Sequence, residues 1–374
     1  MLINGLKVAT INIALLCALV LAFDVAAYFL LPAQFDPPGY RTAAFAYRTA
    51  VGGLMYPRYY FGANESRGFD IKPASQGIKV TNDFLFPIEV NEFGCRDRKI
   101  SLDPTKPFIY VAGDSQTWGI VPTATRWTER LDQLLGRPIL NCGVPGTAQR
   151  HQYDKYREVV RTLKRLPDLV LVGYVSNDAW EDAAFPAYTV VDGFLIRNDA
   201  NRTVLKARVQ EGIERLNHSR FIDRIKGVLK NYSLSAHIFK RLWSLVDSGL
   251  AASPSDSTYN YSDPEASANK SAIKEFARGV CSSGARFALI VLPDSAHLAF
   301  PDYFQGLDEF LNDQGIFSVD LHQMLSNQGM KYSDLSQIND PHYSVIGNRH
   351  VADALYGLMQ KYANNFGSCK NLAP

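Results

Sequence analysis

Residues 107–115 read PFIYVAGDS, a short apolar run that ends in Gly-Asp-Ser. Four more runs of this kind follow along the chain, and they read PILNCGV (138–144), DLVLVGYV (168–175), RFALIVLPD (286–294) and GIFSVDLH (315–322). Continuous apolar runs closed by polar or turn residues are typical of strands that are buried on both faces of a sheet. The five segments are therefore predicted to form the strands of one sheet.

Segments with helical spacing of their apolar residues separate these runs. They read WTERLDQLLG (127–136), YDKYREVVRTLKRL (153–166) and SAIKEFARGV (271–280), and a final helix is expected over 344–362. Strands that alternate with helices pair in parallel, because the crossover between them is right-handed and covers the sheet. The sequence thus predicts an α/β fold with a five-stranded parallel sheet.

The 374 residues divide into four expected parts. We predict a membrane anchor over residues 1–34, an extended lead-in over 35–105, the α/β domain over 106–365 and a tail over 366–374. An insertion over 179–270 interrupts the alternation of strands and helices, and we expect it to cap the carboxyl edge of the sheet.

The insertion is predicted to be mainly helical. It begins with AYTVVDGFLI (187–196), whose apolar halves flank Asp-Gly and so predict a β-hairpin. Apolar spacing then predicts helices over 204–216, 219–230 and 233–247, and the polar composition of 251–271 predicts a loop.

The N-terminal part contains VATINIALLCALVLAFDVAAYFLL (8–31), an apolar stretch of 24 residues that Pro32 follows. At about 1.5 Å per residue, a helix of this length matches the roughly 30 Å hydrocarbon core of a bilayer. The stretch predicts a transmembrane helix. The alternative is a cleaved signal peptide, with the small residues Val25, Ala26 and Ala27 at the cleavage site.

Positive charges flank this stretch on both sides, since Lys7 precedes it and Arg41 and Arg48 follow it. The positive-inside rule therefore does not fix the orientation. A short tail before one long domain suits a signal anchor. We expect the domain to lie outside the cytoplasm, in the periplasm if the protein is bacterial.

Charge and cysteine content exclude several classes of protein. Lys and Arg number 39 and Asp and Glu 37, so the net charge of +2 does not call for a nucleic-acid partner. None of the five Cys forms a C-x-x-C pair, which excludes a zinc ribbon or a thioredoxin motif. The histidines show no ligand spacing, and we expect neither a metal nor a cofactor. The pairing of Cys95, Cys142, Cys281 and Cys369 stays open.

Polar residues with complementary chemistry follow the predicted strands. Ser115 comes after the first strand, Gly146 after the second and Asn177 after the third, while Asp340 and His342 precede the last helix. Because the carboxyl ends of parallel strands form the usual ligand edge, we expect these residues to meet there. A serine nucleophile needs a base, an acid that orients the base, and donors for the oxyanion, and this set supplies each of them.

A second D-x-H pair, Asp320 and His322, stands at the end of the fifth run. It closes a strand and no Gly-led helix follows it, whereas Pro341 favours an extended Asp340 whose side chain faces the same way as His342. We therefore assign the acid and the base to Asp340 and His342.

These blocks resemble the SGNH (GDSL-type) hydrolase superfamily. The resemblance implies a flavodoxin-like three-layer α/β/α domain with strand order 2-1-3-4-5, which brings the ends of the first three strands together. It implies that Ser115 is the nucleophile, that Asp340 and His342 complete the catalytic set, and that the Ser115 N–H, Gly146 and Asn177 form the oxyanion hole. The chain departs from the common pattern of this superfamily at two places. Gln116 follows Ser115 where Leu is common, and the acid and the base are spaced D-x-H where D-x-x-H is common.

The segment NEFGCRD (91–97) is also similar to the lead-in of membrane-anchored members that are associated with bacterial surface polysaccharides. The resemblance therefore implies an O-acylesterase or an O-acetyltransferase with an acyl-enzyme on Ser115. Its substrate would be an acylated sugar or another acyl ester of a cell-surface polysaccharide or glycan, and a membrane acyl-donor protein or complex is a candidate partner. The alternatives are a lipase or thioesterase of the same superfamily and a non-enzymatic accessory subunit of a membrane complex.

Overall fold

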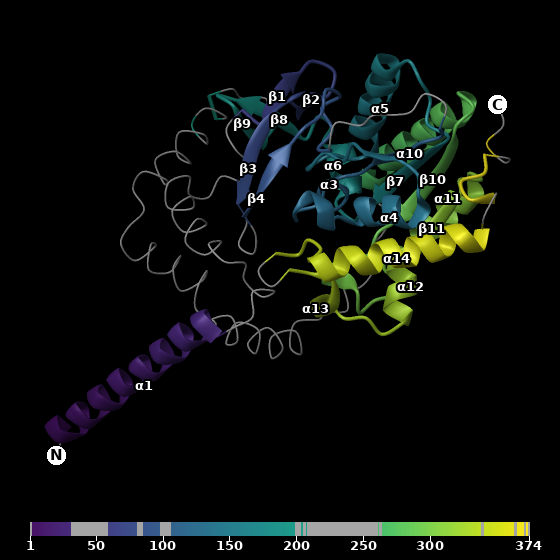
Figure 1. The fold of residues 1–374 in the computed structure, drawn as a ribbon. Coiled ribbons are helices and arrows are strands. Elements are labelled where there is room, and N and C mark those ends of the chain that lie inside the picture. The colour runs from purple at the N-terminus through teal and green to yellow at the C-terminus, as the bar shows by residue number, and fades with distance from the viewer. Residues whose placement is uncertain are drawn as a thin grey trace. The chain divides into compact units, whose positions relative to one another are not determined.

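The computed structural model describes residues 2–30, 59–80, 85–97, 106–198, 261, 264–337, 340–362 and 365–369, together with residues 203, 204, 207 and 372. The chain divides into two compact units. One comprises residues 1–54 and 212–253, and its long described helix is α1 (Leu2–Leu30). The other comprises residues 55–211 and 254–374 and contains every described strand (Figure 1).

The transmembrane helix expected over residues 8–31 is not found. Within the part of the chain that the structure describes, no helix has both the length and the apolar character needed to cross a bilayer.

Five parallel strands form the central sheet of the larger unit, as the sequence predicts. They are β5 (Ile109–Ala112), β6 (Ile139–Asn141), β7 (Leu169–Tyr174), β10 (Arg286–Val291) and β11 (Ser318–Asp320). Their order in space is β11-β10-β7-β5-β6, and every neighbouring pair is parallel. When the five strands are numbered 1 to 5 in chain order and read from the β6 edge, this is the order 2-1-3-4-5. It places the ends of β5, β6 and β7 side by side.

Helices cover both faces of the sheet and make a three-layer unit (Figure 1). On one face, α5 (Gln149–Leu163), α10 (Pro264–Ser282) and α11 (Gln305–Asp313) pack on Tyr110, Val170 and Leu289. On the other, α4 (Trp127–Leu135), α12 (Leu321–Asn327) and α14 (Val345–Tyr362) pack on Val111, Leu171 and Ile290. Neighbouring residues of a strand point to opposite faces, and so a continuous apolar run fills both layers.

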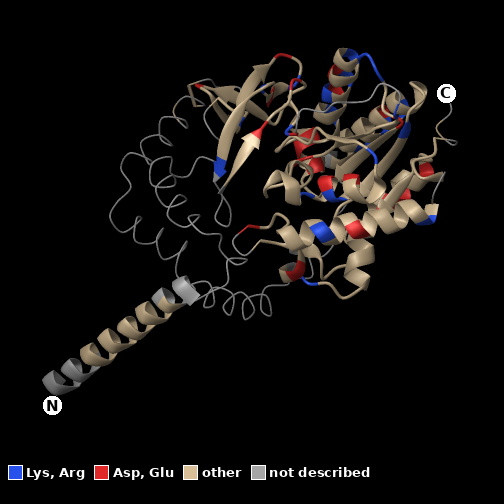
Figure 2. Ribbon diagram, in the orientation of Figure 1, with Lys and Arg blue, Asp and Glu red and all other residues tan. Residues whose placement is uncertain are grey.

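Short elements complete this unit. They are α3 (Ser115–Trp118), η1 (Thr123–Thr125), α6 (Asp178–Ala183), η3 (Ser295–His297) and α13 (Tyr332–Leu335). Lys and Arg are interspersed with Asp and Glu over its described elements (Figure 2).

The lead-in contains two hairpins that the sequence analysis did not predict. β1 (Phe61–Asn64) pairs with β2 (Gly68–Ile71), and β3 (Gln76–Val80) pairs with β4 (Leu85–Glu89), both antiparallel. Their apolar side chains pack with Trp118 at the end of α3 and with Ile120 and Val144 from the loops of the main sheet. Gly62, Asn64, Gly68 and Pro87 are residue types that strands disfavour, so these segments carry a weak strand signal.

The start of the insertion agrees with the sequence prediction, because β8 (Tyr188–Val191) and β9 (Phe194–Arg197) form an antiparallel hairpin. Asp192 and Gly193 at its turn both have positive φ, which suits a two-residue hairpin turn. The helices predicted over 204–216, 219–230 and 233–247 fall almost wholly outside the described residues. The polar loop predicted over 251–271 is wrong at its end, because α10 begins at Pro264, a residue that the first turn of a helix tolerates.

Candidate active site

The nucleophile candidate lies at the first turn after the central strand. β5 ends at Ala112, and α3 begins at Ser115. Between them, Asp114 caps the helix, because its Oδ1 accepts a hydrogen bond of 2.8 Å from the Gln116 N–H. The Ser115 side chain is half-buried. The strand-to-helix turn therefore presents the hydroxyl at the carboxyl edge of the sheet.

His342 and Asp340 reach this hydroxyl from the loop before α14. The Nε2 atom of His342 is 2.8 Å from the Ser115 Oγ, and its Nδ1 atom is bonded to the Asp340 carboxylate. The same carboxylate accepts the His342 backbone N–H at 2.9 Å. Since a carboxylate only accepts, Nδ1 carries the ring proton and Nε2 is left to accept the proton of Ser115. The structure thus brings these three predicted residues into one hydrogen-bonded chain.

Charge around Asp340 favours its ionised form. Burial raises the pKa of Asp340, but hydrogen bonding and attraction from His342, with a smaller contribution from Lys79, bring it below the ordinary value. Lys79 is buried on β3, and this burial lowers its pKa to about 7 although Asp340 opposes the shift. Asp340 therefore stays charged at neutral pH and can stabilise a protonated His342.

The two departures from the family pattern keep the geometry of the site. Gln116 accepts a hydrogen bond of 3.3 Å from the Tyr343 backbone N–H through its Oε1, so it ties α3 to the residue that follows His342. Leu could not do this. The D-x-H spacing lets Asp340 reach both the ring and the backbone N–H of His342.

Asn177 lies on the other side of Ser115, at the end of β7. Its side chain hydrogen-bonds to Asp114 and Glu181. Asp114 in turn contacts the nucleophile candidate, because its Oδ2 is 3.2 Å from the Ser115 Oγ. Asn177 is exposed, so its amide is accessible at the edge where Ser115 is presented.

Gly146 lies in the loop that follows β6. It has a φ of 76°, which favours glycine. The same loop is bonded to the turn before the nucleophile candidate, because the Val144 N–H donates to the Gly113 carbonyl at 2.9 Å. Its start is tied to the lead-in by the disulfide between Cys142 and Cys95. The second disulfide joins Cys281 and Cys369.

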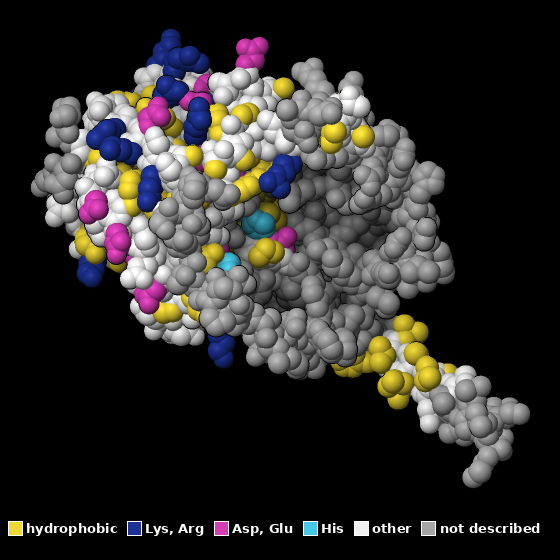
Figure 3. All heavy atoms as spheres, turned by 180° about the vertical axis from the view of Figure 1, so that it is seen from behind, with side chains coloured by type: hydrophobic (Ala, Val, Ile, Leu, Met, Phe, Trp, Pro, Cys, Tyr) yellow, Lys and Arg dark blue, Asp and Glu magenta, His cyan; other side chains and the backbone are white. Residues whose placement is uncertain are grey.

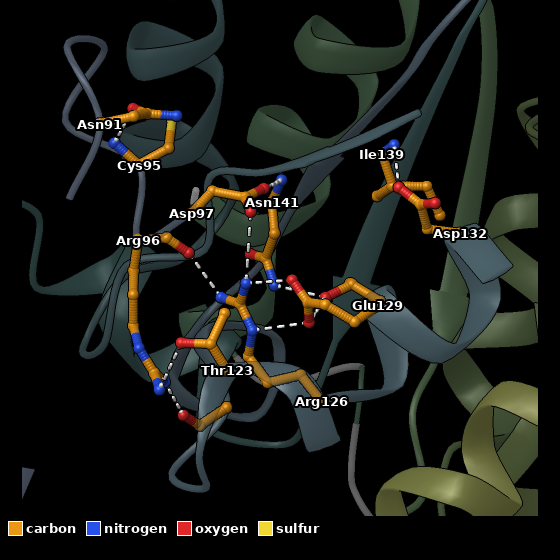
Figure 4. A network of polar contacts seen from close by, with 12 residues as sticks. Asn91, Cys95, Arg96, Asp97, Thr123, Arg126, Glu129, Asp132, Ile139 and Asn141 are labelled. Atoms are coloured by element: carbon orange, nitrogen blue, oxygen red, sulfur yellow. Dashed lines mark hydrogen bonds and ion pairs between the residues drawn. The ribbon is translucent and has the colours of Figure 1, made fainter. Parts of the chain in front are cut away.

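A buried polar network supports α3 and β6 from the side of the lead-in (Figure 4). The Arg96 guanidinium donates to the carbonyls of Trp118 at 3.1 Å and Val121 at 2.7 Å, and it stacks on the Trp118 ring. Asp97 accepts the Asn141 backbone N–H at 2.9 Å and lies 3.6 Å from the Arg126 guanidinium. This network gives NEFGCRD a structural role that sequence reasoning missed, since its partners are distant in the chain.

Other residues singled out in the sequence have structural roles. His322 is fully buried, and its Nε2 donates to the Phe300 carbonyl at 2.8 Å while its Nδ1 accepts the Asp294 N–H at 3.1 Å. Asp320 caps α12. Both ring nitrogens of His322 are thus occupied, which argues against the second D-x-H pair. Among the described residues, no group of three or more His, Cys, Asp or Glu could hold a metal ion.

Histidine side chains reach the surface on the face seen from behind in Figure 3, among hydrophobic side chains and close to an acidic one. Beneath the site, by contrast, acidic groups are buried. Burial raises the pKa values of Asp178 and Glu181 well above their ordinary range, and the nearby Asp114 raises both further. The Oδ2 of Asp178 accepts hydrogen bonds of 2.9 Å from Gln149 and from the Val175 N–H. Its Oδ1 is buried and has no hydrogen-bond partner among the described residues.

Comparison with known proteins gives only distant likenesses. No family model and no curated protein matches the chain. Solved structures that are similar include a putative lipolytic protein of the G-D-S-L family from Desulfitobacterium hafniense, with 12% identity, 67% of this chain and 98% of that chain covered, and a TM-score of 0.37. A catalytic mutant of an acetylxylan esterase from Geobacillus stearothermophilus is 11% identical, covers 71% of this chain with 97% of its own, and has a TM-score of 0.35. An esterase from a Pseudoalteromonas species is 13% identical, covers 69% of this chain with 99% of its own, and has a TM-score of 0.36. At these values the likeness assigns no activity to the chain.

Asp178→Asn should make the stability of the protein less sensitive to rising pH. In the unfolded chain Asp178 has the ordinary pKa of about 3.9 and loses its proton above that pH. In the folded protein its pKa is raised, so the proton is kept to higher pH. The free energy of unfolding therefore falls as the pH rises above about 3.9. Asn keeps the acceptor for Gln149 and Val175 and does not titrate. Urea unfolding measures the free energy of unfolding of the variant and of wild type at pH 5 and at pH 8. The value for the variant minus that for wild type should be larger at pH 8 than at pH 5. A difference that is equal at both pH values would contradict the expectation.

Proposed function

We propose that the protein is a serine-dependent acyl-ester enzyme of the SGNH type, with Ser115 as the nucleophile. The observation that carries this proposal is the hydrogen-bonded chain from Ser115 through His342 to Asp340, with 2.8 Å between the Ser115 Oγ and the His342 Nε2. A nucleophile, a base and an acid that orients the base are the parts that acyl transfer through serine requires.

In the proposed reaction, the Ser115 Oγ attacks the ester carbonyl and its proton passes to the His342 Nε2. The Asp340 carboxylate stabilises the imidazolium that forms. The oxyanion of the tetrahedral intermediate accepts hydrogen bonds from the Ser115 and Gly146 backbone N–H groups and from the Asn177 amide. Collapse of the intermediate expels the alcohol, which takes the proton from His342, and leaves an acyl group on Ser115. No cofactor is needed in these steps.

The acceptor of the acyl group decides between two enzymes. If His342 activates water, the protein is an O-acylesterase; if it activates a sugar hydroxyl, the protein is an O-acetyltransferase. We place the substrate among cell-surface polysaccharides or glycans, because the short D-x-H spacing resembles that of some polysaccharide O-acetylating relatives and NEFGCRD resembles the lead-in of members associated with surface polysaccharides. In the transferase reaction a membrane acyl-donor protein or complex would supply the acyl group.

Ser115→Ala should abolish hydrolysis of p-nitrophenyl acetate, with a loss in kcat/KM of about 10³-fold or more, because the variant lacks the hydroxyl that would form the acyl-enzyme. The wild-type protein should also form a covalent adduct with a serine-directed fluorophosphonate, detected by mass spectrometry, and the variant should not. Ser333→Ala, at an exposed serine on α13, is the matched control and should be labelled like wild type. A wild-type protein that hydrolyses no ester and takes no label would be an accessory subunit instead.

Asn177→Ala should lower kcat by roughly 10²–10³-fold, the usual cost of losing one oxyanion donor. Because the Asn177 side chain also hydrogen-bonds to Asp114 and Glu181, the unfolding midpoint is measured alongside, to separate a loss of stability from the loss of the donor. Steady-state kinetics with p-nitrophenyl acetate measure the effect, and Asn312→Ala at the exposed end of α11 serves as the control. A decrease in kcat of less than about threefold would rule out an oxyanion role for this amide.

We also propose that the domain works outside the cytoplasm. Its two disulfides, Cys95–Cys142 and Cys281–Cys369, support this location, since disulfides persist in oxidising compartments and are rare in the cytosol. The first closes a segment with a sequence separation of 47 residues and the second one of 88 residues, so both constrain the unfolded chain considerably.

Counting free thiols tests this location. Of the five Cys, four are in disulfides and Cys17 is free. Protein that is trapped in acid from intact cells and denatured without reductant should therefore bind one maleimide before reduction and five after it, by mass spectrometry. If the trapped protein binds five maleimides before reduction, the domain resides in a reducing compartment.

A further inference from the structure

Aromatic side chains from the insertion form one wall beside the proposed oxyanion site. The Tyr188 ring packs on Gly146, so that a Cβ added to this glycine would lie 3.0 Å from the ring Cε2. Tyr188 is the first residue of β8, and its ring is partly exposed. The hairpin of β8 and β9 therefore borders the site on the side of Gly146.

Trp180 extends this wall towards Asn177. It lies on α6, which begins directly after Asn177, and its ring centroid is 6.2 Å from that of Tyr188 in an edge-to-face arrangement. Arg197 at the end of β9 pairs with Tyr188 across the hairpin, and its guanidinium lies 4.3 Å above the Trp180 ring. Trp180 is partly exposed and Arg197 exposed. Two aromatic rings and one guanidinium thus lie together beside the two proposed oxyanion donors.

The wall is held rigidly by the lead-in. A Cβ added to Gly68 on β2 would lie 2.6 Å from the Tyr188 carbonyl oxygen, and the Phe69 ring lies edge-to-face with the Tyr188 ring at 6.2 Å. The Tyr59 N–H donates to the Gly193 carbonyl in the hairpin turn at 2.7 Å. Rings that are fixed before binding lose little conformational entropy when a ligand docks on them.

From this arrangement we propose that Tyr188, Trp180 and Arg197 form a subsite that binds the sugar ring of the ester substrate. The inference rests on the proposed function and names the group next to the reacting ester. A pyranose ring has one face of C–H groups, which packs on an aromatic ring, and an edge of hydroxyls, which accept hydrogen bonds. The Tyr188 ring supplies the first contact, and the outward N–H groups of Arg197 supply the second.

Charge favours a sugar over a long acyl chain at this place. The guanidinium of Arg197 lies over the Trp180 ring, so an alkyl chain on this wall would have to desolvate a charged group without giving it a hydrogen bond. A ring with hydroxyls gives Arg197 acceptors in exchange for water. The wall therefore suits a polar ring with one apolar face.

Two acetyl esters test the subsite: 6-O-acetylglucose, which has a sugar ring with free hydroxyls, and p-nitrophenyl acetate, which has no sugar ring. In the full-length protein, Tyr188→Ala should lower the ratio of kcat/KM for the first substrate to that for the second by about tenfold, within the range for one lost apolar contact. Tyr188→Phe keeps the ring and should keep the ratio within about twofold. Arg197→Ala should lower the ratio through a higher KM for 6-O-acetylglucose. Tyr362→Ala, at a partly exposed tyrosine near the end of α14, should leave the ratio unchanged.

The outcomes separate this inference from the function on which it rests. If wild type hydrolyses both esters and Tyr188→Ala leaves the ratio unchanged, the subsite is wrong and the serine enzyme stands. If Tyr188→Ala lowers both kcat/KM values equally, the ring acts through the Gly146 loop and not on a sugar, which also overturns the subsite. If Tyr188→Ala lowers kcat/KM selectively for p-nitrophenyl octanoate, the wall binds the acyl chain and not a sugar. If wild type hydrolyses neither ester and Ser115 takes no fluorophosphonate, the proposed function itself fails.

Discussion

The close approach of Thr117 to the ends of three strands is the constraint on which the site depends. A Cβ added to Gly113 after β5 would lie 2.1 Å from the Thr117 Oγ1, and one added to Gly173 in β7 would lie 2.4 Å from it. A Cβ on Gly143 after β6 would lie 2.6 Å from the Trp118 backbone N. Any side chain at these positions would push α3 away from the sheet. Because glycine stands at each of them, α3 lies directly on the strand ends and Ser115 is presented next to the ends of β6 and β7.

A helix of four residues has almost no stability of its own, so its position must be fixed by its surroundings. Asp114 accepts an N–H of its first turn, and Arg96 binds the carbonyl of its last residue, Trp118, and that of Val121 beyond it. The loop that carries His342 is attached to the same segment, because the Gln337 Nε2 donates to Ile120 O at 2.8 Å while its N–H donates to His342 O at 2.9 Å. The nucleophile and base candidates are thus positioned from one scaffold, although they are 227 residues apart in sequence.

What the sequence could predict follows from the range of the interactions. The five strands and the D-x-H pair carry local signals, namely an apolar run, a strand-end turn and a two-residue spacing. The 188–197 hairpin is marked by Asp-Gly between apolar residues. Arg96, the two disulfides and the β1–β4 hairpins carry no such signal. Asp97, for example, looks like an ordinary surface residue until the fold brings it to Asn141 and Arg126.

The two carboxyl groups nearest to Ser115 differ in their electrostatic surroundings, and this difference gives the proposed proton transfer a direction. Burial raises the pKa of Asp114, whereas the pairing with His342 brings the pKa of Asp340 below its ordinary value despite burial. An ionised Asp114, 3.2 Å from the Ser115 Oγ, would compete with His342 for the hydroxyl proton. Burial disfavours the charged form of Asp114 and so weakens that competition, while the ionised Asp340 makes His342 the stronger acceptor. Environments that separate the pKa values of two neighbouring carboxyl groups are how a site assigns them different roles.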